Sequence, residues 1–443
     1  RDDREASQLS RGKQSSRRGG IWYTPQSGIW QTVWCEWVPD NHIKAIRYTP
    51  DLITNQLLYQ VQAKQPAGAI VRLSLHGEAI AESAADEKGF GALDIPPEML
   101  RLWSPESPTL YDVDVTLGED HVTSYAAMRS IGVGEDEDGV PRLLLNGRPY
   151  FQNGVLDQGY FPDGLYTAPS DDAMVFDIQL MKDLGFNMLR KHIKIEPLRW
   201  YYHCDRLGMV VWQDMVNNGS YSYFRDTVLP TIGIQKRNDR RLHRDERSRN
   251  AFRQGAADAV NQLKNHPCIC YWTIFNEGWG QFDSDRVCGW FRTLDATRFI
   301  DTTSGWFRGK NTDVDSRHQY FGKLRLEGDG LRPLVLSEFG GKTWRVEGHI
   351  FNPDKTYGYG ACPTREALNE AVAALYRESI VPAVEKGLCA AIYTQVSDVE
   401  DEVNGLITYD RRVVKLDADT MLPISRALQD AMEKTVASFE KMG

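Results

Sequence analysis

Eight short apolar runs between residues 150 and 394 have the length and composition of buried strands, and helical periodicity separates several of them. The runs cover 150–155, 186–191, 208–213, 268–275, 298–303, 314–320, 332–337 and 388–394. Helices are indicated by Ser170 before Asp171–Leu184, by Pro197, and by the long amphipathic stretch Thr364–Lys386 ahead of Gly387. Strands that alternate with helices are typical of βαβ units. We therefore predict a (β/α)8 TIM barrel for residues 134–443.

Residues 39–133 show a different pattern. Short runs of alternating apolar and polar residues, such as 57–63 and 69–75, are separated by Gly, Pro and Asp clusters every eight to twelve residues. Such spacing is typical of antiparallel strands joined by turns. The pattern predicts a β-sandwich in front of the barrel.

The first 38 residues combine a polar arm with a dense aromatic stretch. Residues 1–20 are rich in Arg, Asp, Ser and Gln, whereas Trp22, Trp30, Trp34 and Trp37 follow on largely alternating positions. Alternation of this kind predicts a strand, and its tryptophans need a second sheet to cover them.

Composition excludes several classes of function. The chain has 443 residues and a net charge of -9, which disfavours a nucleic-acid partner. No apolar run approaches the ~18 residues that cross a bilayer, so no membrane anchor is expected. The seven cysteines are scattered without the paired spacing of a zinc site, and they predict reduced thiols in a cytoplasmic protein. Residues 1–20 lack the apolar core of a signal peptide, although secretion stays open if this chain is a fragment.

Two strand ends carry the candidate chemistry. The strand at 268–275 runs into Asn276 and Glu277, and the strand at 332–337 runs into Glu338. Barrel enzymes place their catalytic groups at these carboxyl ends. Two carboxylates there indicate hydrolysis of a glycosidic bond. The alternative is that each Glu caps a helix or pairs with an Arg.

Several segments resemble glycoside hydrolase family 2, which includes β-galactosidases, β-glucuronidases and β-mannosidases. The segments are Asn-Glu after the fourth strand, Glu after the seventh, GIW-x-x-P-x-SGIWQ-x-V from residue 20, and W-x-P-x-x-P-x-L-Y at 103–111. The resemblance implies that residues 1–38 end a jelly-roll sugar-binding domain, that 39–133 form an immunoglobulin-like sandwich, and that 134–443 form the catalytic barrel. Because most of that jelly-roll is absent, we expect a separate chain or a missing segment to complete it.

The resemblance also assigns roles to the strand-end residues. It makes Glu338 the nucleophile and Glu277 the acid/base of a retaining reaction, with Asn276 donating to the sugar 2-hydroxyl and Tyr320 contacting Glu338. The physical chemistry agrees, because the charge of one carboxylate helps its neighbour to keep a proton. A strand-end Asn that turns the chain and an ordinary packed Tyr are the alternatives.

Other strand ends supply further candidates by resemblance. Asp157 and Gln158 leave the first strand, where family members place a polar pair against the sugar. Arg190 and His192 end the second strand; the resemblance makes Arg190 a partner of the nucleophile, and His192 a hydroxyl ligand or a structural histidine.

The third and eighth strands add Asp214 and Tyr393. Asp214 closes a Trp-Gln-Asp triplet like that of the β-mannosidases, and it could hold Arg190 or a sugar hydroxyl. Tyr393 occupies the position at which many relatives carry a Trp that lines the bottom of the sugar-binding site. An aromatic ring suits the apolar face of a pyranose.

Two departures bear on the substrate. Asn404-Gly-Leu-Ile has no Lys where the glucuronidases bind the substrate carboxylate, and neither the first-strand His nor a metal cluster of the galactosidases is present. We predict a retaining exo-β-glycosidase that acts on a carbohydrate, with β-galactosidase favoured over β-glucuronidase or another β-hexosidase. The sequence indicates no cofactor and no metal ligands, and it leaves open whether a metal assists. A catalytically silent carbohydrate-binding or assembly subunit is the alternative from another class. A homo-oligomer is possible.

Overall fold

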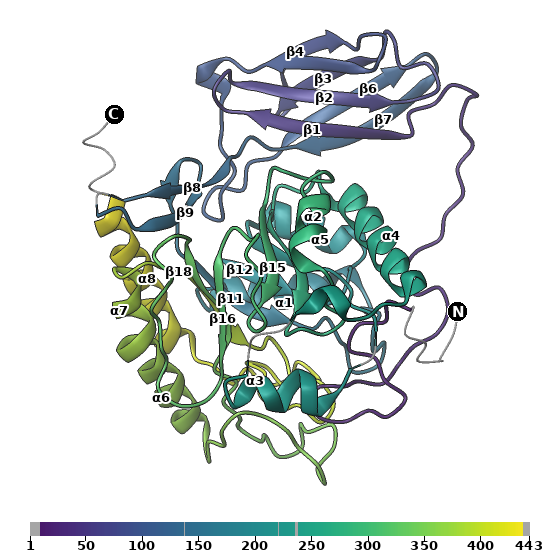
Figure 1. Ribbon diagram of the computed structural model, residues 1–443. Helices are drawn as coiled ribbons and strands as arrows, with labels where there is room; N and C mark the ends of the chain where they lie inside the picture. The colour runs from purple at the N-terminus through teal and green to yellow at the C-terminus, as the bar shows by residue number, and fades with distance from the viewer. Residues whose placement is uncertain (1–8, 137, 220, 235–237, 437–443) are drawn as a thin grey trace.

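An eight-stranded parallel sheet forms the centre of the computed structural model, which describes residues 9–136, 138–219, 221–234 and 238–436 (Figure 1). The strands are β11 (Gln152–Asp157), β12 (Met188–Lys191), β13 (Val210–Asp214), β14 (Ile269–Asn276), β15 (Phe299–Ser304), β16 (Asp315–Gln319), β17 (Leu334–Phe339) and β18 (Leu388–Thr394). Their order is β15-β14-β13-β12-β11-β18-β17-β16. The edge strands meet where the Ser304 and Ser316 hydroxyls lie 3.3 Å apart, so the barrel is nearly closed. The predicted TIM barrel is confirmed.

Helices surround the barrel and bury their apolar faces against it. They are α1 (Asp171–Asp183), α2 (Leu198–Leu207), α4 (Glu246–Leu263), α5 (Ser284–Phe291), α6 (Arg365–Leu375), α7 (Val381–Val384) and α8 (Ala418–Val436), with a short α3 (Leu229–Thr231) between β13 and β14. The Ser170 hydroxyl accepts a hydrogen bond from the Ala173 amide at 3.2 Å, as expected of an N-cap. The predicted helix 364–386 is divided by a π-helical turn at Tyr376–Ile380.

The sandwich consists of two antiparallel sheets. One sheet contains β1 (Ala45–Asp51), β2 (Gln56–Gln62) and β5 (Phe90–Asp94), and the other contains β3 (Ile70–Leu75), β4 (Glu78–Ala84), β6 (Tyr111–Leu117) and β7 (Asp120–Ala126). Alternate residues such as Val71, Leu73, Val113 and Val115 are buried between the sheets, which is why the sequence alternates.

The sandwich lies against the amino-terminal end of the barrel, beside the hairpin of β8 (Ile131–Glu135), β9 (Pro141–Leu145) and β10 (Arg148–Pro149) (Figure 1). The Tyr125 hydroxyl donates to Asp205 at 2.7 Å, and the Arg129 guanidinium donates to the carbonyls of Pro267 and Ile269 at 2.6 and 2.8 Å. Pro267 and Ile269 are at the entry of strand β14. The sandwich is therefore on the side of the barrel opposite the strand ends that carry Glu277 and Glu338.

The amino-terminal segment differs from the prediction. Residues 24–38 contain no strand, and residues 1–8 of the predicted arm lie outside the described part of the chain. Trp22 packs edge-on against Trp279 with ring centroids 5.2 Å apart, and Trp30 packs against Tyr166 at 4.6 Å. The alternation at Trp22 and Trp30 therefore reflects packing on barrel loops rather than membership of a sheet.

The second half of this segment exposes its apolar side chains: Trp34 is 70% and Trp37 100% exposed, and Ile29 and Val33 accompany them. Contiguous exposed apolar surface usually marks an interaction site. We predict that a sheet from another polypeptide, or from a segment outside this chain, covers residues 29–38. The double variant Trp34→Ser/Trp37→Ser should then bind an apolar fluorescent dye less than the wild type does. A chain that sediments as a monomer and binds no more dye than this variant would contradict the prediction.

Two further observations concern the whole chain. The seven cysteines are all free thiols, and five of them are buried. Among the helices that the structure describes, none combines the length and the apolar character that crossing a membrane requires. The cytoplasmic location stays a prediction.

Candidate active site

The ends of β14 and β17 bring two carboxylates together. One oxygen each of Glu277 and Glu338, together with one ring nitrogen of His318, lie within 4.8 Å of one another. Glu277 follows β14 with a φ of 51°, and Gly278 has a φ of 76°, so the chain turns in left-handed conformations that few side chains adopt. Such backbone strain in a non-glycine residue is often found at functional sites.

Glu338 is held as an anion. Arg190 Nη1 lies 3.1 Å from Glu338 Oε1, and the Tyr320 hydroxyl donates to Oε2. Burial of Glu338 opposes its ionisation, but the nearby His318 and Arg190 outweigh burial and lower the pKa of Glu338 to about 2. Burial, with the adjacent Glu338 charge, also raises the pKa of Tyr320, so Tyr320 keeps the proton that it donates. Glu338 is thus ionised near neutral pH.

Arg190 connects the polar groups at three strand ends. Its guanidinium donates to both oxygens of Asp214 at 3.0 Å and to Asn276 Oδ1 at 2.9 Å. Because Asn276 accepts through its oxygen, its amide NH2 is the group left to donate. Within the described chain that NH2 has no hydrogen-bond acceptor, which fits the predicted donation to a sugar hydroxyl.

His192 also has one atom available. Its Nδ1 lies 2.7 Å from Asp214 Oδ2, whereas Nε2 is buried without a hydrogen-bond partner in the described residues. Burial, helped by the charge of Lys13, lowers the pKa of His192, so the ring is neutral near neutral pH. A neutral ring that donates from Nδ1 can accept a hydrogen bond from a sugar hydroxyl at Nε2.

His318 is a member of this cluster that the sequence analysis did not single out. Its Nδ1 lies 2.8 Å from Glu277 Oε1, and its Nε2 lies 3.0 Å from the Ser304 hydroxyl. A hydrogen bond between His318 and Glu277 can run in either direction, because the imidazole nitrogen can donate or accept. Strand alternation could have identified His318 from the sequence. His318 lies two residues before the predicted site residue Tyr320, and side chains two apart on a strand point to the same face.

Three predicted sugar ligands have their main contacts elsewhere. Asp157 is paired with Lys191 at 2.6 Å, and the Gln158 amide donates to Gln395 at 2.9 Å. The Tyr393 hydroxyl accepts from the Lys342 amide at 3.0 Å, and its ring is so close to Gly340 that a Cβ there would lie 2.3 Å away. The Tyr393 ring is therefore packed against the backbone of Gly340. The structure records no contact between these three residues and the two carboxylates.

The cluster of Glu277, His318 and Glu338 is also the kind of group that could hold a metal ion. Each member already has protein partners, and the Arg190 guanidinium 3.1 Å from Glu338 would repel a cation. The arrangement therefore suits two carboxylates that exchange protons and bonds with a substrate better than it suits a resident metal.

Curated relatives of similar sequence are β-galactosidases. The chain is 29% identical to a β-galactosidase of Klebsiella pneumoniae over 323 residues, which are 67% of this chain and 30% of that protein. It is 26% identical to a β-galactosidase of Lactococcus lactis over 284 residues, which are 63% of this chain and 27% of that protein. The chain thus spans less than a third of the length of these relatives.

Structural comparison and family models agree on the fold. A β-D-glucuronidase from Dictyoglomus thermophilum superposes with a TM-score of 0.65 at 18% identity, covering 89% of this chain and 69% of that one. The model of the glycosyl hydrolases family 2 TIM barrel domain matches residues 140–327, and a second model, glycosyl hydrolases family 2, matches residues 41–133. The chain belongs to glycosyl hydrolases family 2.

Proposed function

We propose that this chain carries the catalytic site of a retaining exo-β-glycosidase that prefers β-galactosides. The observation that carries the proposal is the close approach of Glu277 and Glu338, whose oxygens are within 4.8 Å. Retaining glycosidases separate their carboxyl groups by about 5–5.5 Å, whereas inverting enzymes need about 6.5–9.5 Å to admit a water. The spacing at this site supports double displacement.

The first step forms a glycosyl-enzyme. A Glu338 oxygen attacks the anomeric carbon, the glycosidic C–O bond breaks, and Glu277 gives its proton to the leaving oxygen. In the second step a water attacks the same carbon, the bond to Glu338 breaks, and Glu277 takes a proton from that water. Both residues return to their starting protonation states.

The surrounding groups support these steps. The free amide NH2 of Asn276 is placed to donate to the sugar 2-hydroxyl, a contact that strengthens as positive charge develops on the ring. Tyr320 and Arg190 hold both oxygens of Glu338 in position for attack. His318 lies 2.8 Å from Glu277 through Nδ1 and 3.6 Å from Glu338 through Nε2, so its ring connects the two carboxyl groups.

The preference for a neutral sugar rests on the names of the curated relatives and on the region of Asn404. Asn404 accepts from Gln395 at 2.9 Å and donates to Glu402 at 3.2 Å, so its own neighbours are an amide and a carboxylate. The Lys415 ammonium nearby is paired with Asp398 at 2.7 Å. Lys191 and Lys194, which could have replaced the missing cation, both lie 2.9 Å from Glu196.

A panel of nitrophenyl β-glycosides tests the proposal. We expect kcat/KM for the β-galactoside to exceed that for the β-glucuronide by about 10-fold or more, because a substrate carboxylate without a partner costs about 1–3 kcal/mol. A higher kcat/KM for the β-glucuronide would contradict the proposed preference for galactosides but would still agree with the proposed retaining reaction. Absence of turnover with every glycoside would instead support the silent carbohydrate-binding or assembly subunit.

A further inference from the structure

Tyr320, whose hydroxyl donates to Glu338, lies just beyond the end of its strand. The last paired residue of β16 is Gln319, opposite Phe339 of β17. Backbone pairing therefore does not fix the direction of the Tyr320 side chain. A tyrosine that turns to another rotamer would lose the hydrogen bond to Glu338, so the orientation of Tyr320 depends on what packs against its ring.

The ring of Tyr359 supplies this packing. The Tyr320 and Tyr359 rings are stacked, with centroids 4.3 Å apart and planes inclined by 12°. The His318 ring is farther away, with its centroid 6.4 Å from that of Tyr320 and its plane nearly perpendicular. Stacked aromatic rings attract each other. A Tyr320 ring that lies flat against Tyr359 keeps its hydroxyl directed at Glu338 Oε2.

Tyr359 is itself held by the strand that carries Glu338. The Tyr359 amide donates to the carbonyl of Gly341 at 3.0 Å, and Gly341 follows Glu338 by three residues. Gly341 has a φ of 75°, and a Cβ at this position would overlap Tyr359 Cδ2. The Tyr359 ring is thus packed directly on the glycine. Contacts run from Glu338 along its own strand to Tyr359, then to Tyr320, and back to Glu338.

The connection that carries Tyr359 is also fixed on its other side. Residues 340–364 connect β17 with α6. Within them the Tyr357 amide donates to the Asp401 carbonyl at 2.7 Å, and the Val403 amide donates to the Tyr357 carbonyl at 3.0 Å. Backbone pairing therefore supports Tyr359 from the exit of β17 and from the segment beyond β18.

We propose that Tyr359 is a positioning residue for the nucleophile, because its ring holds Tyr320 in the orientation in which the Tyr320 hydroxyl donates to Glu338. The assignment rests on the proposed reaction, in which Glu338 attacks the anomeric carbon. Arg190 holds one oxygen of Glu338 and Tyr320 the other. Loss of the Tyr320 contact leaves the second oxygen without this donor. Tyr359 acts on Glu338 through Tyr320 and needs no contact with the sugar.

A double-mutant cycle separates this role from direct contact with the substrate. Tyr320→Phe should lower kcat for nitrophenyl β-galactoside about 10- to 100-fold with little change in KM, as for loss of a hydrogen bond to a charged group. Tyr359→Leu should cause a partial loss of about 5- to 50-fold, since the hydroxyl is displaced rather than removed. Added to Tyr320→Phe, Tyr359→Leu should cost no more than about 2-fold further, because residues that act through one interaction are not additive. Losses that multiply in the double variant would overturn the assignment.

Two further variants test whether the aromatic ring is the feature that matters. Tyr359→Phe keeps the stacked ring and should stay within about 3-fold of the wild-type kcat. Tyr359→Met fills more of the space than Leu but stacks less well, and it should behave like Tyr359→Leu. Equal kinetics for the Phe and Met variants would show that the ring does not position Tyr320.

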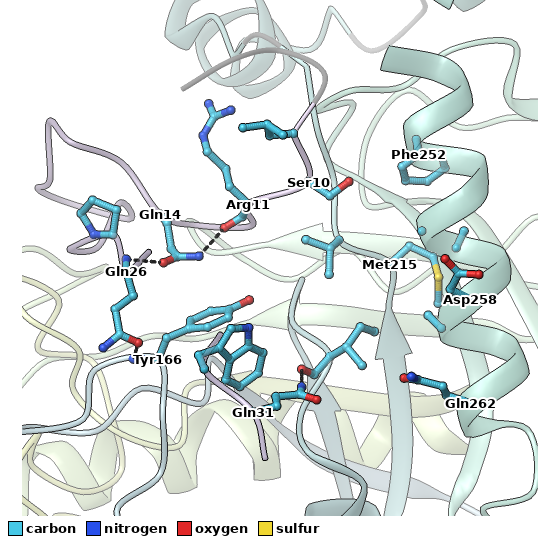
Figure 2. Close-up of a pocket in the computed structure, with 18 of the residues that line it drawn as sticks. Ser10, Arg11, Gln14, Gln26, Gln31, Tyr166, Met215, Phe252, Asp258 and Gln262 are labelled. Carbon is cyan, nitrogen blue, oxygen red and sulfur yellow. Dashed lines mark hydrogen bonds between the residues drawn. The ribbon is translucent and has the colours of Figure 1, made fainter. Parts of the chain in front are cut away.

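Tyr166→Leu is the matched control. Tyr166 is also a tyrosine packed on another aromatic ring at the exit side of the barrel, because its ring centroid lies 4.6 Å from that of Trp30. It lies beside a cavity of about 520 Å³ whose lining contains neither carboxylate (Figure 2). Tyr166→Leu should lower the temperature of thermal unfolding but leave kcat unchanged. A loss of kcat equal to that of Tyr359→Leu would show that general destabilisation explains both.

A crystal structure of the Tyr359→Leu variant tests the position of Tyr320 without turnover. We expect the distance from the Tyr320 hydroxyl to Glu338 to exceed about 3.5 Å, beyond the range of a hydrogen bond. A hydroxyl that remains bonded to Glu338 would overturn the assignment. A displaced hydroxyl, with a wild type that hydrolyses no glycoside, would refute the proposed reaction and leave the support of Tyr320 by Tyr359 established.

Discussion

Replacing Glu338 by Gln is expected to lower kcat by about 10⁴-fold or more on every β-glycoside, the range typical of a lost nucleophile. The substitution keeps the size of the side chain but removes the anion that attacks the anomeric carbon. The neighbouring carboxyl group, Glu277, supplies the proton in the proposed reaction and is therefore not expected to replace Glu338. The measurement is steady-state turnover of nitrophenyl β-galactoside.

Glu327→Gln is the matched control for this substitution. Glu327 is exposed on the connection between β16 and β17, so its replacement should leave kcat unchanged. Thermal unfolding of the Glu338→Gln variant should show that the fold is retained, since Arg190 keeps its ion pair with Asp214. If kcat of the Glu338→Gln variant stayed within about 10-fold of the wild-type kcat, Glu338 would be excluded as the nucleophile.

Replacing Glu277 by Ala is expected to separate substrates by leaving group. Glycosides of dinitrophenol need little protonation, so their first step survives, whereas substrates with poor leaving groups should lose about 10²- to 10⁴-fold in rate. Hydrolysis of the glycosyl-enzyme slows because no base activates the water. Added azide should restore turnover and give a β-glycosyl azide, detected by NMR.

The stereochemistry of that product is decisive. In double displacement the azide replaces Glu338 from the face that the leaving group occupied, so the β configuration returns. An α-glycosyl azide would mean that the azide displaces the leaving group in a single inverting step, which would contradict double displacement. An equal loss of rate on dinitrophenyl and on alkyl glycosides would show that Glu277 does not protonate the leaving group.

The sequence predicted the barrel because its strands are apolar on both faces and end in polar residues. Each of the eight strands lies where its apolar run indicates. Glu277 and Glu338 were recognisable because a carboxylate directly after an apolar run is unusual, and strand ends of a parallel barrel meet at one face.

The sequence was less informative where long-range packing decides the conformation. The alternating tryptophans predicted a strand, but Trp22 and Trp30 pack on barrel loops that lie far away in the sequence. Asp157 stays a predicted sugar ligand, and its ion pair with Lys191 on the neighbouring strand was not foreseen from the sequence. Periodicity shows which face a side chain occupies and gives no information on which partner it meets.

Trapping of the covalent intermediate tests the central claim most directly. A 2-deoxy-2-fluoro-β-galactoside with a dinitrophenyl leaving group slows both steps, and the second step more, so a retaining enzyme accumulates the glycosyl-enzyme. Peptide mass spectrometry should find one fluorogalactosyl group on Glu338, with none in the Glu338→Gln variant. Label on Glu277 or on any other residue, or complete turnover without label, would contradict the assignment of Glu338 as the nucleophile of a retaining β-glycosidase.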